Sequence, residues 1–155
     1  MSRFIPAVAA LLLVAIGAVS TAQQEVTVVV TPGTEVWGPA PPKLPAGAQI
    51  AVIFGDRSKP GELYAFRAKL PDGYSVPPHT HPMDEHVTVL QGTLLIGFGE
   101  ARNESELTEL PTGSYVTLPS TVPHYNRMRG ETILQFHGIG PYDINYVNAA
   151  DDTGR

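Results

Sequence analysis

The chain has 155 residues, contains no cysteine and carries a formal net charge of −5 at pH 7. This length suits one domain of ordinary size, and the lack of cysteine excludes disulfide bonds and thiolate metal sites. The mild, dispersed acidity argues against nucleic acid and anionic lipid as partners, because both attract basic surfaces.

The first 22 residues have the pattern of a secretory signal peptide. Arg3 provides a basic start, residues 4–19 are almost wholly apolar and uncharged, and small residues lead up to Ala22. The apolar run is shorter than the roughly 20 residues that span a bilayer, so cleavage after Ala22 is favoured over a retained membrane anchor. We therefore expect a signal-peptide helix at 1–22, export to the periplasm or the medium, and no membrane association after cleavage. Removal of Arg3 leaves 9 basic and 15 acidic residues, a net charge of −6.

The mature chain reads as a series of short strands. Of the fifteen glycines and fifteen prolines of the whole chain, fourteen of each follow residue 22 and interrupt the mature chain every few residues, and the segments between them are short and rich in β-branched residues. Residues 23–48 are expected to form an N-terminal strand and a proline-rich lead-in, and residues 49–150 one β-barrel domain. The expected strands are Glu25–Val30, Gln49–Phe54, Leu63–Lys69, His86–Leu90, Leu94–Phe98, Tyr115–Leu118, Tyr125–Met128, Thr132–Ile139 and Ile144–Val147. Many short strands joined by turns favour an all-β, antiparallel sandwich or barrel.

The segment between Gly73 and Gly92 holds a cluster of metal-ligand residue types. His79 and His81 are two residues apart, so on a strand they project from the same face and two imidazoles can reach one ion. Glu85 would lie about 13 Å beyond His81 on a fully extended chain, so the chain must turn between them. After that turn, alternation assigns Glu85 to the barrel interior and His86 to the other face.

His124 completes the candidate ligand set from a different strand, next to Pro123. Three imidazoles and one carboxylate, without cysteine, are typical of a borderline-to-hard divalent ion. Taken singly, His79 and His81 could be exposed turn residues, and His124 could be a core histidine. The joint spacing of all four residues favours metal binding.

These residues resemble the first motif of the cupin superfamily: glycine, five residues, His-x-His, three or four residues, glutamate, six residues and glycine. Gly73, His79, His81, Glu85 and Gly92 occupy every fixed position of that pattern. The second cupin motif is matched in part, by Gly113, Pro119 and His124. Thr121 stands where glycine is usual, and Met128 where asparagine is usual.

The resemblance implies an antiparallel double-stranded β-helix, or jelly-roll barrel, of the small exported bacterial type. It also implies a metal centre of His79, His81, Glu85 and His124 that holds Fe, Mn or Ni, with Zn or Cu as further candidates. Single-domain cupins often exchange an N-terminal strand between subunits, so a homodimer is a further expectation.

Two polar residues on the last long strand are weak candidates for catalysis or substrate binding. Gln135 and His137 share one face of the strand, and the sequence leaves open whether that face points into the barrel or to solvent.

An octahedral ion with four protein ligands has two open positions, and these suit two kinds of reaction on a small oxygenated molecule. One is oxidation with dioxygen, and the other is Lewis-acid stabilisation of an enediolate or carbanion. We expect an oxidoreductase of the dioxygenase or oxidase type. The alternatives are a metal-dependent isomerase or lyase and a non-catalytic protein that binds a small ligand or a metal, since cupin folds host all of these.

Overall fold

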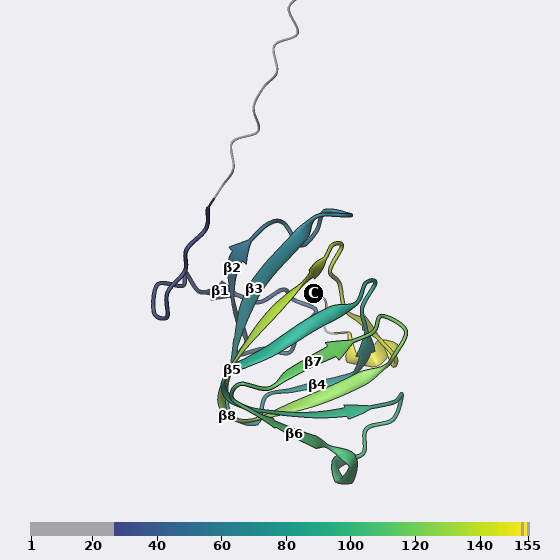
Figure 1. Ribbon diagram of the computed structural model, residues 1–155. Helices are drawn as coiled ribbons and strands as arrows, with labels where there is room; N and C mark the ends of the chain where they lie inside the picture. The colour runs from purple at the N-terminus through teal and green to yellow at the C-terminus, as the bar shows by residue number, and fades with distance from the viewer. Residues whose placement is uncertain (1–26, 153, 155) are drawn as a thin grey trace, which may run out of the picture.

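The computed structural model describes residues 27–152 and 154, so the signal peptide expected at 1–22 lies outside the described residues. All regular structure in the described part is β-strand, apart from two short 3₁₀ helices, η1 (Glu104–Glu106) and η2 (Ala149–Asp151) (Figure 1). The all-β class is therefore confirmed. No helix within the described ranges is long and apolar enough to cross a membrane.

The strands, all paired antiparallel, form two sheets that share their two longest strands. The strands are β1 (Gly38–Pro39), β2 (Gln49–Phe54), β3 (Leu63–Leu70), β4 (Ser75–Thr80), β5 (Glu85–Phe98), β6 (Thr108–Pro111), β7 (Tyr115–Leu118), β8 (His124–Ile139) and β9 (Asn145–Tyr146). The first sheet has the order β1-β2-β3-β8-β5-β7, through the C-terminal half of β8 and the N-terminal half of β5. The second has the order β6-β5-β8-β4-β9, through the other halves of the same two strands.

Gly92 lies where β5 passes from one sheet to the other. The register between β5 and β8 shifts on either side of Gln91, and Gly92 has a φ of 75°. A Cβ atom on Gly92 would lie 2.5 Å from both the Glu131 carbonyl oxygen and the Thr132 hydroxyl. Only glycine allows this backbone approach together with a left-handed conformation, and so it permits the two sheets to close into a barrel.

The expected strands agree with the structure in most places. Gln49–Phe54 and Tyr115–Leu118 are confirmed at both ends. Two pairs of expected strands are instead single long strands, β5 and β8, because the bends between their halves leave the antiparallel pairing largely intact. Residues 27–30, the described part of the expected strand Glu25–Val30, form no strand and pair with no other strand.

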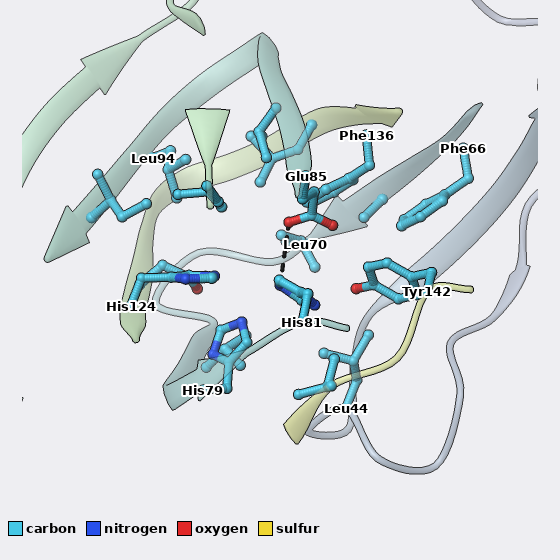
Figure 2. A pocket seen from close by; sticks show the side chains of 18 of the residues that line it. Leu44, Phe66, Leu70, His79, His81, Glu85, Leu94, His124, Phe136 and Tyr142 are labelled. Carbon is cyan, nitrogen blue, oxygen red and sulfur yellow. Dashed lines mark ion pairs between the residues drawn. The ribbon is translucent and has the colours of Figure 1, made fainter. Parts of the chain in front are cut away.

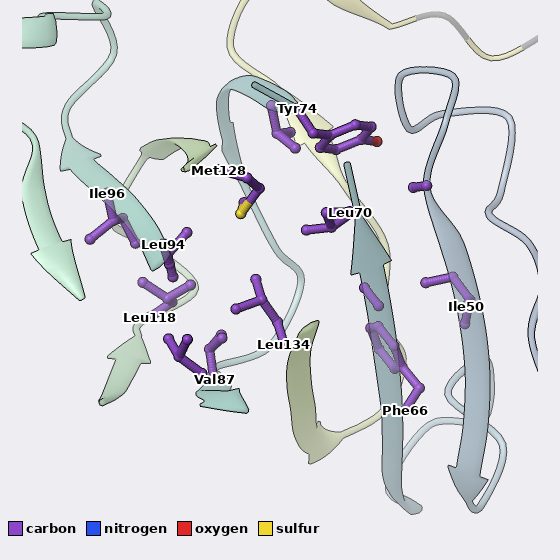
Figure 3. Packing of buried hydrophobic residues seen from close by; sticks show 14 of the residues in the cluster. Ile50, Phe66, Leu70, Tyr74, Val87, Leu94, Ile96, Leu118, Met128 and Leu134 are labelled. Atoms are coloured by element: carbon purple, nitrogen blue, oxygen red, sulfur yellow. The ribbon is translucent and has the colours of Figure 1, made fainter. Parts of the chain in front are cut away.

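The core fills the space between the two sheets (Figure 3). Alternate residues on each strand point inward, as on β3, where Tyr64, Phe66, Ala68 and Leu70 are buried. The central cluster comprises Ala48, Ile50, Tyr64, Phe66, Ala68, Leu70, Tyr74, Val76, Val87, Val89, Leu94, Ile96, Leu118, Met128 and Leu134. This apolar packing surrounds the interior end of the candidate site.

Candidate metal centre

The four residues expected to bind a metal lie at neighbouring strand ends. His79 is in β4, His81 follows β4 directly, Glu85 begins β5 and His124 begins β8. His79 and His124 are direct partners in the pairing of β4 with β8. All four side chains are buried, and Figure 2 shows them directed toward a common space.

The distances between these side chains suit a shared ion. The imidazole ligand atoms of His79, His81 and His124 all lie within 4.8 Å of one another. His81 Nε2 lies 3.3 Å from Glu85 Oε2. Two ligand atoms that are each about 2.1 Å from one ion are separated by about 3.0 to 3.4 Å. The three histidines could therefore hold a divalent ion, and the Glu85 carboxylate is adjacent to it.

Each histidine is oriented by a backbone carbonyl that its Nδ1 contacts. The acceptors are the carbonyls of Pro77, at 2.7 Å from His79, of Asp143, at 2.7 Å from His81, and of Val122, at 3.1 Å from His124. An Nδ1–H that donates to a carbonyl leaves Nε2 unprotonated and able to bind a metal. The hydrogen bond at Nδ1 of each ring thus selects the tautomer in which Nε2 can bind a metal.

Burial shifts the pKa of each of these four groups in the direction that favours its neutral form. Desolvation lowers the pKa of His81 to about 4 and that of His124 below its usual value, and it holds that of His79 well below it. Desolvation also raises the pKa of Glu85 to about 8. Without a metal, the His81–Glu85 contact at pH 7 is therefore between neutral groups, although its geometry is that of an ion pair.

Two buried atoms of the site have no hydrogen-bond partner. These are His81 Nε2 and Glu85 Oε1. An unsatisfied polar atom in the interior costs about 1 to 3 kcal/mol, and an unpaired charge costs more. A divalent cation fits this donor set, because it would satisfy both atoms and would neutralise the carboxylate.

A bulge at Pro77–Pro78 directs His79 into the barrel. Val76 and His79 both point inward although they are three residues apart, and the register of β4 against β8 shifts between them. Proline lacks the N–H that a regular ladder requires, so two successive prolines favour such a bulge. Beyond it, His79 and His81 alternate regularly, and the chain bends at Pro82–Met83 before Glu85, where the sequence predicted a turn.

The site opens into a cavity of about 50 Å³. This is room for the centres of a few water molecules or for a small ligand beside an ion. Its polar lining residues are the three histidines, Glu85, Asn126 and Tyr142. The remaining walls are the apolar residues Leu44, Ile50, Phe66, Ala68, Leu70, Val76, Val87, Leu94, Ile96, Leu118, Met128, Leu134, Phe136 and Ile144.

Gln135 and His137 lie on the outer face of the barrel and do not line this cavity. The Gln135 amide oxygen accepts a hydrogen bond from Arg67 Nε at 3.1 Å. The ring of His137 stacks on His86, with centroids 5.0 Å apart. In β8 the inward residues of this stretch are Leu134 and Phe136, so the orientation that the sequence left open is outward.

Tyr142 and Asn126 line the cavity but are absent from the residues assigned from the sequence. Asn126 follows His124 by two residues and therefore shares its face, which is a usable sequence signal. Tyr142 lies in the segment after β8 and stacks on His81, with centroids 5.2 Å apart and an interplanar angle of 24°. Its pKa is raised well above the usual value, first by burial and then by the nearby Glu85 carboxylate.

Comparisons with known proteins agree with this architecture. Residues 28–155 match the family model described as a domain of unknown function, DUF4437. A search of curated proteins finds no match. Solved structures with the same fold include the polyketide cyclase RemF from Streptomyces resistomycificus, with a TM-score of 0.65, 14% identity, and coverage of 83% of this chain and 90% of that one.

Two further solved structures are similar. An acetylacetone dioxygenase from Acinetobacter johnsonii has a TM-score of 0.62 and 16% identity, with 86% of this chain and 83% of that one covered. KdgF from Halomonas sp. has a TM-score of 0.54 and 17% identity, with 74% and 93% covered. At these identities the likeness establishes the fold alone. The match over residues 28–155 and the shared barrel show that the chain belongs to the DUF4437 family, a cupin-like family.

Proposed function

We propose that this protein is an exported, metal-dependent oxidoreductase of the dioxygenase or oxidase type that acts on a small oxygenated molecule. His79, His81, Glu85 and His124 would be the metal ligands. One observation carries the proposal: three imidazoles held in the metal-binding tautomer converge with a buried carboxylate at the end of an apolar cavity.

The donor set favours Fe, Mn or Ni, with Zn or Cu as competitors, because imidazole and carboxylate suit all of these ions. A bound ion of this kind would supply Lewis acidity and, if it is redox-active, a place for dioxygen beside the substrate. The protein residues would do the remaining work. The histidines and Glu85 hold fixed orientations, and the apolar walls exclude water from the substrate.

The acetylacetone dioxygenase of similar fold supports this direction, since its name describes the oxidation of a small, neutral dicarbonyl compound. The cavity here is small and mostly apolar, which suits a substrate of that kind.

A non-redox function is the second candidate. The polyketide cyclase RemF has a higher TM-score with this chain than the acetylacetone dioxygenase has. A metal-dependent isomerase or lyase would need a general base, and among the described cavity residues only Tyr142 can titrate without being a candidate ligand. The same scarcity of acid–base groups suits a non-catalytic protein that binds a small ligand or a metal.

Metal analysis and oxygen uptake separate these candidates. The protein, purified without an affinity tag, is expected to contain about one Fe, Mn or Ni per chain and to consume oxygen with acetylacetone or a catechol, in a panel that also includes a flavonol as a larger compound and oxalate as an anionic one. Glu85→Gln is expected to lower metal content, and Glu106→Gln, which changes an exposed carboxyl, is the matched control. A metal-loaded protein that consumes no oxygen would contradict the oxidoreductase proposal. A protein that binds no metal would contradict the proposed metal centre as well.

Export is tested separately. If residues 1–22 are a signal peptide, the periplasmic or secreted protein begins at Gln23 when its N-terminus is sequenced. Material that retains Met1 in the cytoplasm would contradict export without affecting the metal site.

A further inference from the structure

We propose that Asn126 and Tyr142 form a substrate subsite beside the metal centre, and that this subsite binds a compact, uncharged molecule with two oxygen functions, such as a diketone or a hydroxyketone. The inference rests on the proposed function for the contact between the ligand and the metal. The remaining part of the inference, that these two side chains bind a ligand, rests on their positions and on the shape of the cavity.

Asn126 presents an unused carboxamide to the cavity. It lies two residues after His124 on β8 and therefore projects from the same face. Its Oδ1 is buried and has no hydrogen-bond partner. Its backbone is paired within the sheet, and its backbone carbonyl also accepts hydrogen bonds from Ser75 Oγ and Arg102 Nη1. A buried carbonyl oxygen without a partner costs free energy, which a ligand O–H group can recover, and rotation of the amide would instead present its N–H groups to a ligand C=O group.

Tyr142 presents an unused hydroxyl on the side of His81. Its backbone N–H donates to the Arg57 carbonyl at 2.7 Å, and its ring stacks on His81, so its position is held at two points. Figure 2 shows the hydroxyl directed toward His81 and Glu85. Among the described residues no hydrogen-bond partner of the Tyr142 hydroxyl is found, which leaves it available to an oxygen atom of a ligand.

The walls of the cavity define the charge and size of that ligand. No lysine or arginine is among the described lining residues, so in the absence of the metal an anionic ligand would lose its hydration without gaining a cationic partner. Arg57 is nearby, but it lies over the rings of Phe66 and Tyr142, 5.5 and 5.6 Å from their centroids, and does not line the cavity. A volume of about 50 Å³ admits only a compact molecule. Apolar walls with two polar groups are the usual composition of a site for such a molecule.

The test uses cobalt-loaded protein, because the visible absorption of Co²⁺ responds to ligands that approach the ion. Acetylacetone is the neutral probe and oxalate is an anionic probe of similar size. Acetylacetone is expected to perturb the spectrum. Because the ion itself attracts anions, the comparison with oxalate is made on the metal-free protein, where acetylacetone is expected to bind more tightly. Asn126→Leu and Tyr142→Phe, which remove one polar group each at nearly constant shape, are expected to raise its Kd about three- to tenfold.

Tyr64→Phe is the matched control, since Tyr64 belongs to the same aromatic cluster but does not line the cavity. Its Kd for acetylacetone is expected to stay within about twofold of the wild-type value, and cobalt content is measured for every variant. Unchanged Kd values in both subsite variants, or tighter binding of oxalate than of acetylacetone to the metal-free protein, would overturn the subsite.

If cobalt does not load at all, the proposed metal function fails, and the subsite is then judged on metal-free protein. Saturation-transfer NMR of acetylacetone should show binding to the wild-type chain and to Tyr64→Phe. The signal should be weaker for Asn126→Leu and Tyr142→Phe. Equal signals in all four proteins would reject the subsite independently of the metal.

Discussion

Replacing Glu85 with glutamine should stabilise the metal-free protein at neutral pH while it weakens metal binding. Glu85 is buried, and burial raises its pKa from 4.5 to about 8. Folding therefore favours the protonated carboxyl, which glutamine imitates in size and charge. The carboxylate that a metal requires is the form that destabilises the empty site.

The sign and the magnitude follow from linkage. A carboxyl whose pKa is higher in the folded state favours folding most below pH 4.5, and this stability is lost as the pH rises through 8. At about 1.4 kcal/mol per unit of pKa, the loss is about 3 kcal/mol at pH 7 and about 5 kcal/mol above pH 8. The lowered pKa values of the three histidines reduce stability as the pH falls below 6.5. That effect is common to both proteins and cancels in their difference.

The assay is urea unfolding in the presence of a chelator, between pH 4.5 and 9. The difference in the free energy of unfolding between Glu85→Gln and the wild type should be near zero at pH 4.5 and should grow to about 3 kcal/mol at pH 7. The control Glu106→Gln should follow the wild-type profile throughout. If the difference between Glu85→Gln and the wild type does not change with pH, the stabilisation does not come from the ionisation of Glu85.

Three other outcomes are expected. Gly92→Ala should lower the free energy of unfolding by at least about 2 kcal/mol in denaturant titrations, because residue 92 has a φ of 75° and its new Cβ would clash with the backbone of residues 131–132. Gly113→Ala, at a φ of 90° with open space around it, should lower it by only about 1 kcal/mol, and equal losses in the two variants would show that the clash is unimportant. A divalent ion at 100 times its Kd should stabilise the protein by about 2.7 kcal/mol in thermal unfolding, and His124→Ala should abolish most of this gain; an equal gain in the variant would remove His124 from the ligand set. Asp143→Asn should lower the free energy of unfolding by no more than about 1 kcal/mol and should leave the metal content unchanged, because the Asp143 side chain pairs with Lys43 at the surface whereas its backbone carbonyl orients His81. A loss of metal in this variant would contradict these separate roles.

Local patterns in the sequence were sufficient to predict the fold class and the grouping of the four candidate ligands. Alternation along a strand is a property of the backbone itself, so Glu85 was correctly assigned to the interior, where Val87 and Val89 of the same strand face are also buried. The turn between His81 and Glu85 followed from the reach of an extended chain, and the structure bends there. His124 was included for its residue type and its place next to Pro123, and the partial second cupin motif supported the same choice.

Pairing between distant strands decided the remaining features. The face on which Gln135 lies depends on which side of β8 meets the core, and the side chains of that strand are too mixed to reveal it. The bend of β5 at Gly92 depends on the approach of residues 131–132, and the continuity of β5 and β8 across both sheets could not be read from two short apolar runs.

The residues of the chain thus specify by themselves where strands form, which side chains alternate and which ligand types are spaced for an ion. Only the folded barrel determined that a bulge at Pro77–Pro78 turns His79 inward, and that Tyr142, 61 residues after His81, stacks on its ring. The reason is physical. Backbone geometry acts over a few residues, whereas contacts across the cavity depend on the register of strands that are far apart along the chain.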